Sequence, residues 1–171
     1  MIVVSDTTPL ISLLKINRLG LLEKLFGEVF IPQAVFNELT ADERFQLEAE
    51  QIRQKKFISI KPVNVPESVN ILKRATGLDL GESEAIVLTD ELKADILLMD
   101  EAKGRSVSSQ MGICIMGTIG ILMAAYEEKT LTSNEVKECI TGLQQDFSHS
   151  IFFPSIIGQR HYQMLLNRLK D

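Results

Sequence analysis

The sequence contains no tryptophan, few other aromatic residues, two cysteines and two histidines among 171 residues. Aliphatic side chains must therefore build the hydrophobic core, and a hydrophobic content of 45% is enough for one soluble domain. Cys114 and Cys139 have neither CxxC nor Cys/His spacing, which excludes the common zinc motifs and favours two reduced, buried thiols. His149 and His161 show no metal-ligand spacing either.

Long hydrophobic runs are also missing. No stretch approaches the roughly 20 apolar residues that a membrane span needs, and the start MIVVSD has no basic segment before its apolar residues. We therefore expect a cytoplasmic protein with no membrane segment and no signal peptide. Neither GxGxxG nor GxxxxGK[ST] occurs, so the usual dinucleotide and P-loop nucleotide sites are not indicated.

The formal net charge is −5. This charge argues against a protein that coats nucleic acid non-specifically, because such proteins neutralise many phosphates with basic side chains. A nuclease is still compatible with it, because a group of acidic metal ligands makes the chain without its cations look more acidic than the working enzyme.

Short apolar runs alternate with helical patterns along the chain. The runs predict strands at about 2–5, 29–31, 57–60, 96–99 and 113–116. Thr8 before Pro9 predicts a helix that starts with a hydroxyl cap. The alternation predicts an α/β fold, with a central parallel sheet of four or five strands flanked by helices. We expect a single domain, with a core at 1–130 and a helical C-terminal extension at 131–171 whose last helix starts at Pro154.

Acidic residues follow several of these strands. Asp6 and Asp100 each end an apolar strand, and Glu38 lies early in the helix after the second strand. Because helices that follow parallel strands begin at the carboxyl edge of the sheet, these three acids should lie on one side of the molecule. Glu82 and Glu84 open a later helix, and the packing of that helix decides whether Glu84 joins the group.

Carboxylates gathered in this way repel one another and raise each other's pKa unless a cation is present. Oxygen ligands of this kind suit Mg²⁺ or Mn²⁺, and a water held there can attack a phosphodiester. Taken singly, Glu38, Glu82 and Glu101 also fit acids that face solvent or complement a helix dipole. Asp6 and Asp100 are harder to explain in that way, because a charge that ends a buried strand needs a partner.

Five segments carry a resemblance to a known family: VVSDTTPLISL, FIPQAVFNEL, LGESEAIVL, ADILLMDEAKGR and GICIMGTIGIL, in this order over residues 2 to about 125. In these segments the chain resembles the PIN-domain nucleases. It is most similar to a prokaryotic subgroup of predicted nucleic-acid-binding proteins close to the VapC-type toxin ribonucleases. The resemblance implies a three-layer PIN-like fold and a Mg²⁺- or Mn²⁺-dependent endoribonuclease that cuts single-stranded or structured RNA.

The resemblance also implies which residues act. The four catalytic metal ligands would be Asp6, Glu38, Glu84 and Asp100, and Glu82 and Glu101 are neighbours that could share or replace these roles. A hydroxyl near the metal would come from Thr7 or Thr118. Lys103 and Arg105 follow the fourth acid, where they could contact an RNA phosphate or simply face solvent. Glu84 stands where the toxins favour Asp, so its side chain is one methylene longer.

The implied partners are RNA, a small antitoxin protein and a second copy of the chain. One alternative is a PIN fold of weak or no catalytic activity that binds nucleic acid or regulates another protein. A haloacid-dehalogenase-like phosphatase is disfavoured, because Thr8 stands where that family places its second aspartate.

Overall fold

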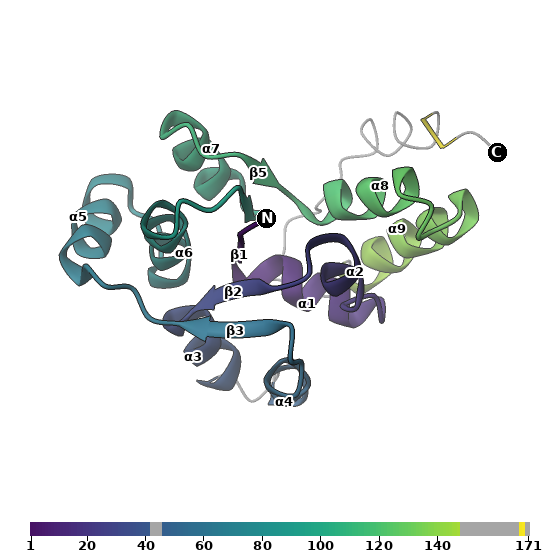
Figure 1. Ribbon diagram of the computed structural model, residues 1–171, viewed down its shortest axis with the longest axis horizontal. Coiled ribbons are helices and arrows are strands. Elements are labelled where there is room, and N and C mark those ends of the chain that lie inside the picture. The colour runs from purple at the N-terminus through teal and green to yellow at the C-terminus, as the bar shows by residue number, and fades with distance from the viewer. Residues whose placement is uncertain (42–45, 148–167, 170–171) are drawn as a thin grey trace.

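The computed structural model describes residues 1–41, 46–147 and 168–169, and their strands form one parallel sheet (Figure 1). Its strands are β1 (Val3–Ser5), β2 (Val29–Pro32), β3 (Ile58–Lys61), β4 (Ile96–Leu98) and β5 (Ile115–Met116). Their order is β3-β2-β1-β4-β5, and every neighbouring pair is parallel. The α/β fold with a parallel sheet is therefore confirmed, and the sheet has five strands with β3 at one edge.

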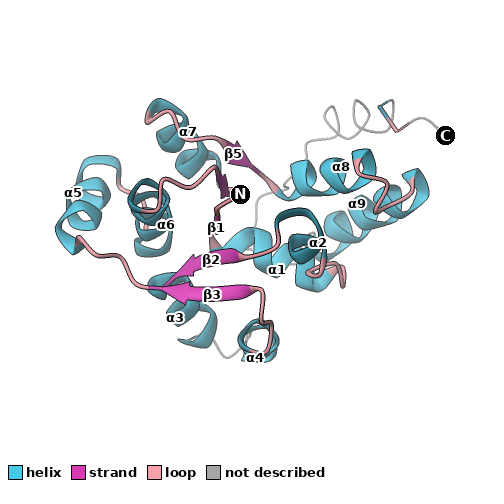
Figure 2. Cartoon of the chain, in the orientation of Figure 1, coloured by secondary structure: helices cyan, strands magenta, loops and turns pink. Residues whose placement is uncertain are grey.

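Helices connect the strands and cover the sheet (Figures 1 and 2). They are α1 (Thr7–Lys15), α2 (Leu21–Phe26), α3 (Gln33–Ala41), α4 (Gln46–Arg53), α5 (Pro66–Thr76), α6 (Leu80–Glu91), α7 (Ala102–Gln110), α8 (Thr118–Glu127) and α9 (Ser133–Phe147). In Figure 1, α5 and α6 lie to the left of the sheet, and α1, α2, α8 and α9 lie to the right. The sheet is thus the middle layer of three.

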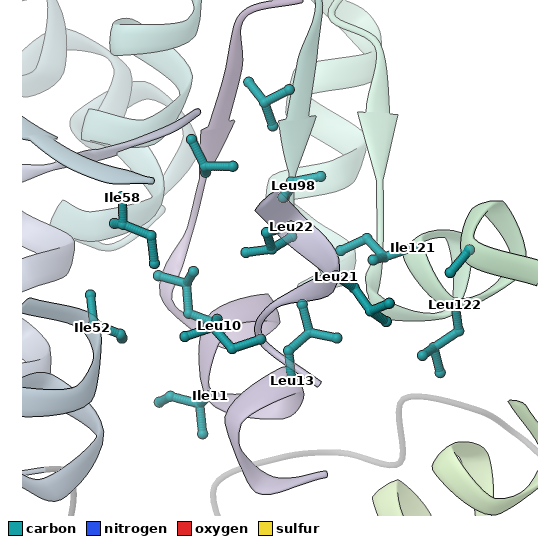
Figure 3. Close-up of a cluster of buried hydrophobic side chains, with 14 of the residues drawn as sticks. Leu10, Ile11, Leu13, Leu21, Leu22, Ile52, Ile58, Leu98, Ile121 and Leu122 are labelled. Atoms are coloured by element: carbon teal, nitrogen blue, oxygen red, sulfur yellow. The ribbon is translucent and has the colours of Figure 1, made fainter. Parts of the chain in front are cut away.

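Two hydrophobic clusters fill the space on the two faces of the sheet. Val3 and Leu98 belong to the larger cluster, whereas their strand neighbours Val4 and Leu97 belong to the smaller one. This alternation follows from the period of two along a strand, which sends successive side chains to opposite faces. Figure 3 shows the larger cluster, in which Leu98 faces side chains of α1, α2 and α8.

The C-terminal part of the described chain packs into the same core. Val136, Ile140 and Leu143 of α9 are buried in the larger cluster. The helix expected from Pro154, together with His149 and His161, lies outside the described residues. No helix in the described ranges is both long and apolar enough to cross a bilayer.

Two local expectations are wrong. Helix α1 begins at Thr7 with Asp6 in the N-cap position, not with a cap at Thr8. Pro9 still fits, because the amides of a first helical turn have no partner within the helix. Cys114 is exposed rather than buried, because it precedes β5, the short strand at one edge of the sheet, whereas Cys139 is buried as expected.

Candidate functional site

Two of the expected acids follow neighbouring strands at the carboxyl edge of the sheet. Strand β1 pairs with β4, and the backbone N–H of Asp6 extends this pairing by donating to the carbonyl of Leu98 at 3.0 Å. Asp100 comes two residues after that carbonyl. The topology therefore places Asp6 and Asp100 at one edge, as the strand pattern indicates.

Asp6 is the most deeply buried acid of this edge, with 4% of its surface exposed. Burial raises the pKa of its carboxyl well above the usual range, and the charges of Asp79, Glu38 and Glu82 raise it further. The backbone N–H of Thr7 opposes these effects on the pKa by donating a hydrogen bond. Asp6 therefore lies in the electrostatic field of three other acids, which come from α3 and from the start of α6.

The carboxylates of Glu38 and Asp79 both lie close to Gly81. A Cβ atom on Gly81 would be 3.1 Å from Oε2 of Glu38 and 3.6 Å from Oδ1 of Asp79. The hydroxyl of Thr7 donates to the same Oε2 of Glu38 at 2.8 Å. Because Thr7 follows Asp6 directly, this hydrogen bond holds Glu38 near Asp6. Acids from three parts of the sequence thus come together.

Glu82 is held by a reciprocal cap at the start of α6. Its N–H donates to Oδ1 of Asp79 at 2.8 Å, and its Oε2 accepts from the N–H of Asp79 at 3.0 Å. The other oxygen, Oε1, is buried and has no hydrogen-bond partner among the described residues. Burial raises the pKa of Glu82, as do the charges of Asp79 and Glu101, whereas the Asp79 N–H and the Lys103 charge lower it.

Glu84 has a different contact. Its Oε2 accepts a hydrogen bond of 2.8 Å from the backbone N–H of Ala34, in the first turn of α3. Such a contact satisfies a helical amide that has no partner within its own helix, and the negative charge suits that end of the helix dipole. The structure thus brings Glu82, rather than Glu84, into the electrostatic group around Asp6.

Asp100 is bound to the start of α8. Its Oδ1 accepts from the N–H of Thr118 at 2.8 Å, and its Oδ2 accepts from the Thr118 hydroxyl at 2.5 Å. Burial raises the pKa of Asp100, while the Thr118 hydrogen bonds and the charge of Arg105 lower it. The guanidinium of Arg105 donates to the carbonyl of Met99 at 2.8 Å, which holds its positive charge near the carboxylate of Asp100.

Lys103 and Glu101 flank the group at the start of α7. The ammonium of Lys103 donates to the carbonyl of Gly77 at 2.8 Å, which joins α7 to the C-terminal end of α5. Glu101 occupies the N-cap position of α7 and is exposed. Both residues are exposed, and the charge of Glu101 raises the pKa of Glu82 whereas the charge of Lys103 lowers it.

Three glycines make room for these carboxylates. The first is Gly81, described above. The second is Gly117, where a Cβ atom would lie 2.7 Å from Oδ1 of Asp100. The third is Gly104, where a Cβ atom would overlap the sulfur of Met99 and lie 3.0 Å from the unpaired Oε1 of Glu82. The edge of the sheet is thus shaped by residues without side chains, each of which lies against a different acid.

Gly104→Ala is expected to destabilise the fold by about 1–2 kcal/mol, because overpacking against buried Met99 outweighs the roughly 1 kcal/mol that alanine gains in a helix. The free energy of unfolding from urea titration measures this change. Gly20→Ala is the matched control, because no atom of the described residues, apart from its two chain neighbours, lies within 4 Å of its Cβ position. We expect the control to be neutral or slightly stabilising. Equal stability of the two variants would contradict the close packing at Gly104.

The donor set fits a hard divalent cation. Carboxylate oxygens are the ligands that Mg²⁺ and Mn²⁺ prefer, and the buried Oε1 of Glu82 lacks the partner that such an atom normally has. In the described ranges, no group of three or more acidic, histidine or cysteine side chains is already arranged to hold one ion. Burial raises the pKa of Asp6, and the charges of three neighbouring acids raise it further, so a bound cation would favour its charged form.

Asp79 is the site residue that the sequence reasoning missed. The signal was present, because an acid three residues before Glu82 has the spacing of a capping box. This spacing predicts a helix that starts at Leu80, and it places the side chain of Asp79 beside Glu82.

Comparison with known proteins agrees with this architecture. A family model described as PIN domain matches residues 2–152, which is most of the chain. No curated protein gives a significant match. The matched range includes all five strands and every acid of the edge described above. The chain therefore belongs to the PIN-domain family, whose members are generally nucleases.

Proposed function

We propose that this protein is a metal-dependent endoribonuclease that hydrolyses phosphodiester bonds of RNA. The observation that carries the proposal is the gathering of Glu38, Asp79 and Glu82 around the buried carboxyl of Asp6. These residues come from α3 and α6, and Asp6 itself links β1 to α1. Like charges at one sheet edge repel one another, and a divalent cation held between them would relieve that repulsion.

The residues that would hold the ion are Asp6, Glu38, Glu82 and Asp100. When bound, Mg²⁺ or Mn²⁺ activates a water and stabilises the charge that develops on the leaving oxygen. Thr7 orients Glu38, and Thr118 orients Asp100, through the hydrogen bonds described above. Glu84 supports this arrangement indirectly, because it fixes the first turn of the helix that carries Glu38.

Two basic side chains, Lys103 and Arg105, have different roles when RNA binds. Lys103 is exposed, so it can exchange the Gly77 carbonyl for a phosphate oxygen. Arg105 stays with the Met99 carbonyl beside Asp100, where its charge faces the same edge. Lys103 therefore binds RNA, and Arg105 keeps the acid in place.

The finer parts of the proposal come from the resemblance to VapC-type toxins. They are a toxin role in the cytoplasm, inhibition by a small antitoxin protein, and a homodimer as the working form. Single-stranded or structured RNA is the substrate class that the same resemblance implies.

A PIN fold that binds RNA without cutting it is the second candidate. One observation favours it: the carboxylates of Asp100 and Glu84 are already occupied by the N–H groups of Thr118 and Ala34. A carboxylate whose oxygens accept backbone hydrogen bonds binds a metal ion less strongly. The two candidates differ in whether Mn²⁺ produces new RNA ends.

The deciding experiment incubates the protein with mixed single-stranded and hairpin RNA, in Mn²⁺ or in EDTA, and separates the products by gel electrophoresis. We expect fragments with Mn²⁺, intact RNA with EDTA, and renewed cutting when excess Mn²⁺ follows EDTA. RNA that is retained in a mobility-shift assay but stays intact under all conditions would reject the nuclease and support the binding module.

A further inference from the structure

Asp79 does more at the start of α6 than cap a helix. Its Oδ1 accepts the N–H of Glu82, and the same oxygen lies near Gly81 on the side that Oε2 of Glu38 also approaches. We propose that Asp79 is a further member of the divalent-cation site, lying at its solvent side and supplying a negative charge that the ion needs. This inference rests on the proposed metal-dependent function.

The position of Asp79 relative to the other acids supports this role. Asp6 and Glu82 are buried, whereas Asp79 and Glu38 are exposed. A cation that enters from solvent therefore meets Asp79 and Glu38 first and reaches Asp6 behind them. The carboxylates of Glu38 and Asp79 approach the same point, since a Cβ atom on Gly81 would be 3.1 Å from Oε2 of Glu38 and 3.6 Å from Oδ1 of Asp79.

The unpaired oxygen of Glu82 is the independent sign of a ligand. Glu82 is 7% exposed, and its Oε1 is buried without a partner in the described part of the chain. Buried carboxylate oxygens are rarely left unpaired, because removing a polar or charged atom from water without a compensating contact is unfavourable. The backbone N–H of Asp79 donates to the other oxygen, so Asp79 also positions the carboxylate of Glu82.

A purely structural role for Asp79 would require only its hydrogen-bonding oxygen. Asparagine caps helices about as well as aspartate, because its side-chain oxygen accepts the same N–H. Asp79→Asn therefore keeps the cap and removes the charge, whereas Asp79→Ala removes both. The two variants separate the structural contribution of Asp79 from its contribution to cation binding.

The experiment measures Mn²⁺ binding to the full chain, by the electron paramagnetic resonance signal of free Mn²⁺, and thermal unfolding in EDTA and in Mn²⁺. Asp90→Asn is the control, because Asp90 is an exposed acid on the same helix that pairs with Lys93 at 2.9 Å. We expect both Asp79 variants to bind Mn²⁺ about 10-fold more weakly than wild type. The Asn variant should unfold in EDTA no earlier than wild type, and the control should bind normally.

Each other outcome has a definite meaning. Normal Mn²⁺ binding by Asp79→Asn, with weak binding and lower stability only in Asp79→Ala, would show that Asp79 is a cap and overturn the inference alone. Weak binding by Asp90→Asn equal to that of Asp79→Asn would show a general charge effect and overturn it as well. Wild-type protein that binds no Mn²⁺ and cuts no RNA would overturn both this inference and the proposed function.

Discussion

Asp6→Asn is expected to lower RNA cleavage in Mn²⁺ by about 1,000-fold or more, equivalent to about 4 kcal/mol of transition-state stabilisation. Asp6 is the most deeply buried acid of the edge, and the charges of three other acids raise its pKa beyond the effect of burial. Asparagine has nearly the same shape but no charge, so the variant removes an anionic ligand without opening a cavity. Single-turnover cleavage rates of wild type and variant measure the change.

The same substitution should stabilise the fold in EDTA at neutral pH. Burial raises the pKa of Asp6 in the folded state, so the folded protein binds more protons than the unfolded chain between the two pKa values. Stability is therefore lost as the pH rises from about 4, the ordinary pKa of aspartate, through the higher pKa of the folded state. Asp6→Asn removes this loss, so urea titrations should show a gain at neutral pH and little change at acidic pH.

Asp90→Asn serves as the control for both measurements, because it removes the same charge from an exposed position. It should cut RNA at the wild-type rate and gain no stability at neutral pH. If Asp6→Asn also cuts at that rate, Asp6 is not part of the site. If the variant is less stable than wild type at neutral pH, the carboxylate of Asp6 is stabilised by contacts in the fold.

The sheet could be predicted because its signals are local. Apolar runs such as 96–99 are too short for helices and end at charged or turn residues, and five of them alternate with helical patterns. Their parallel pairing follows from the helices between them. The cap of α1 could not be predicted from the sequence, because Asp6 and Thr8 are both of residue types that cap helices and the choice between them depends on what their side chains meet in the folded chain.

The candidate site was predictable only as far as topology determines it. Asp6, Glu38 and Asp100 follow strands, so the direction of the sheet places them at one edge. Glu82 and Glu84 differ by about 200° around a helix of 3.6 residues per turn, and only the packing of α6 decides which of them faces Asp6. The pattern of apolar residues in α6 gives little help, because eight of its residues are buried, including Glu82 itself.

Glu82→Gln and Glu84→Gln form a matched pair that resolves this ambiguity by activity. Glu82→Gln should lower cleavage by about 100-fold or more and weaken Mn²⁺ binding, because the unpaired oxygen loses the charge that a cation would neutralise. Glu84→Gln should change cleavage by less than about threefold, because glutamine still accepts from the N–H of Ala34 and holds α3. The measurements are single-turnover cleavage and Mn²⁺ titration on both variants. A larger loss in Glu84→Gln would mean that Glu84 leaves Ala34 to bind the ion, and that α6 or α3 rearranges when the ion binds.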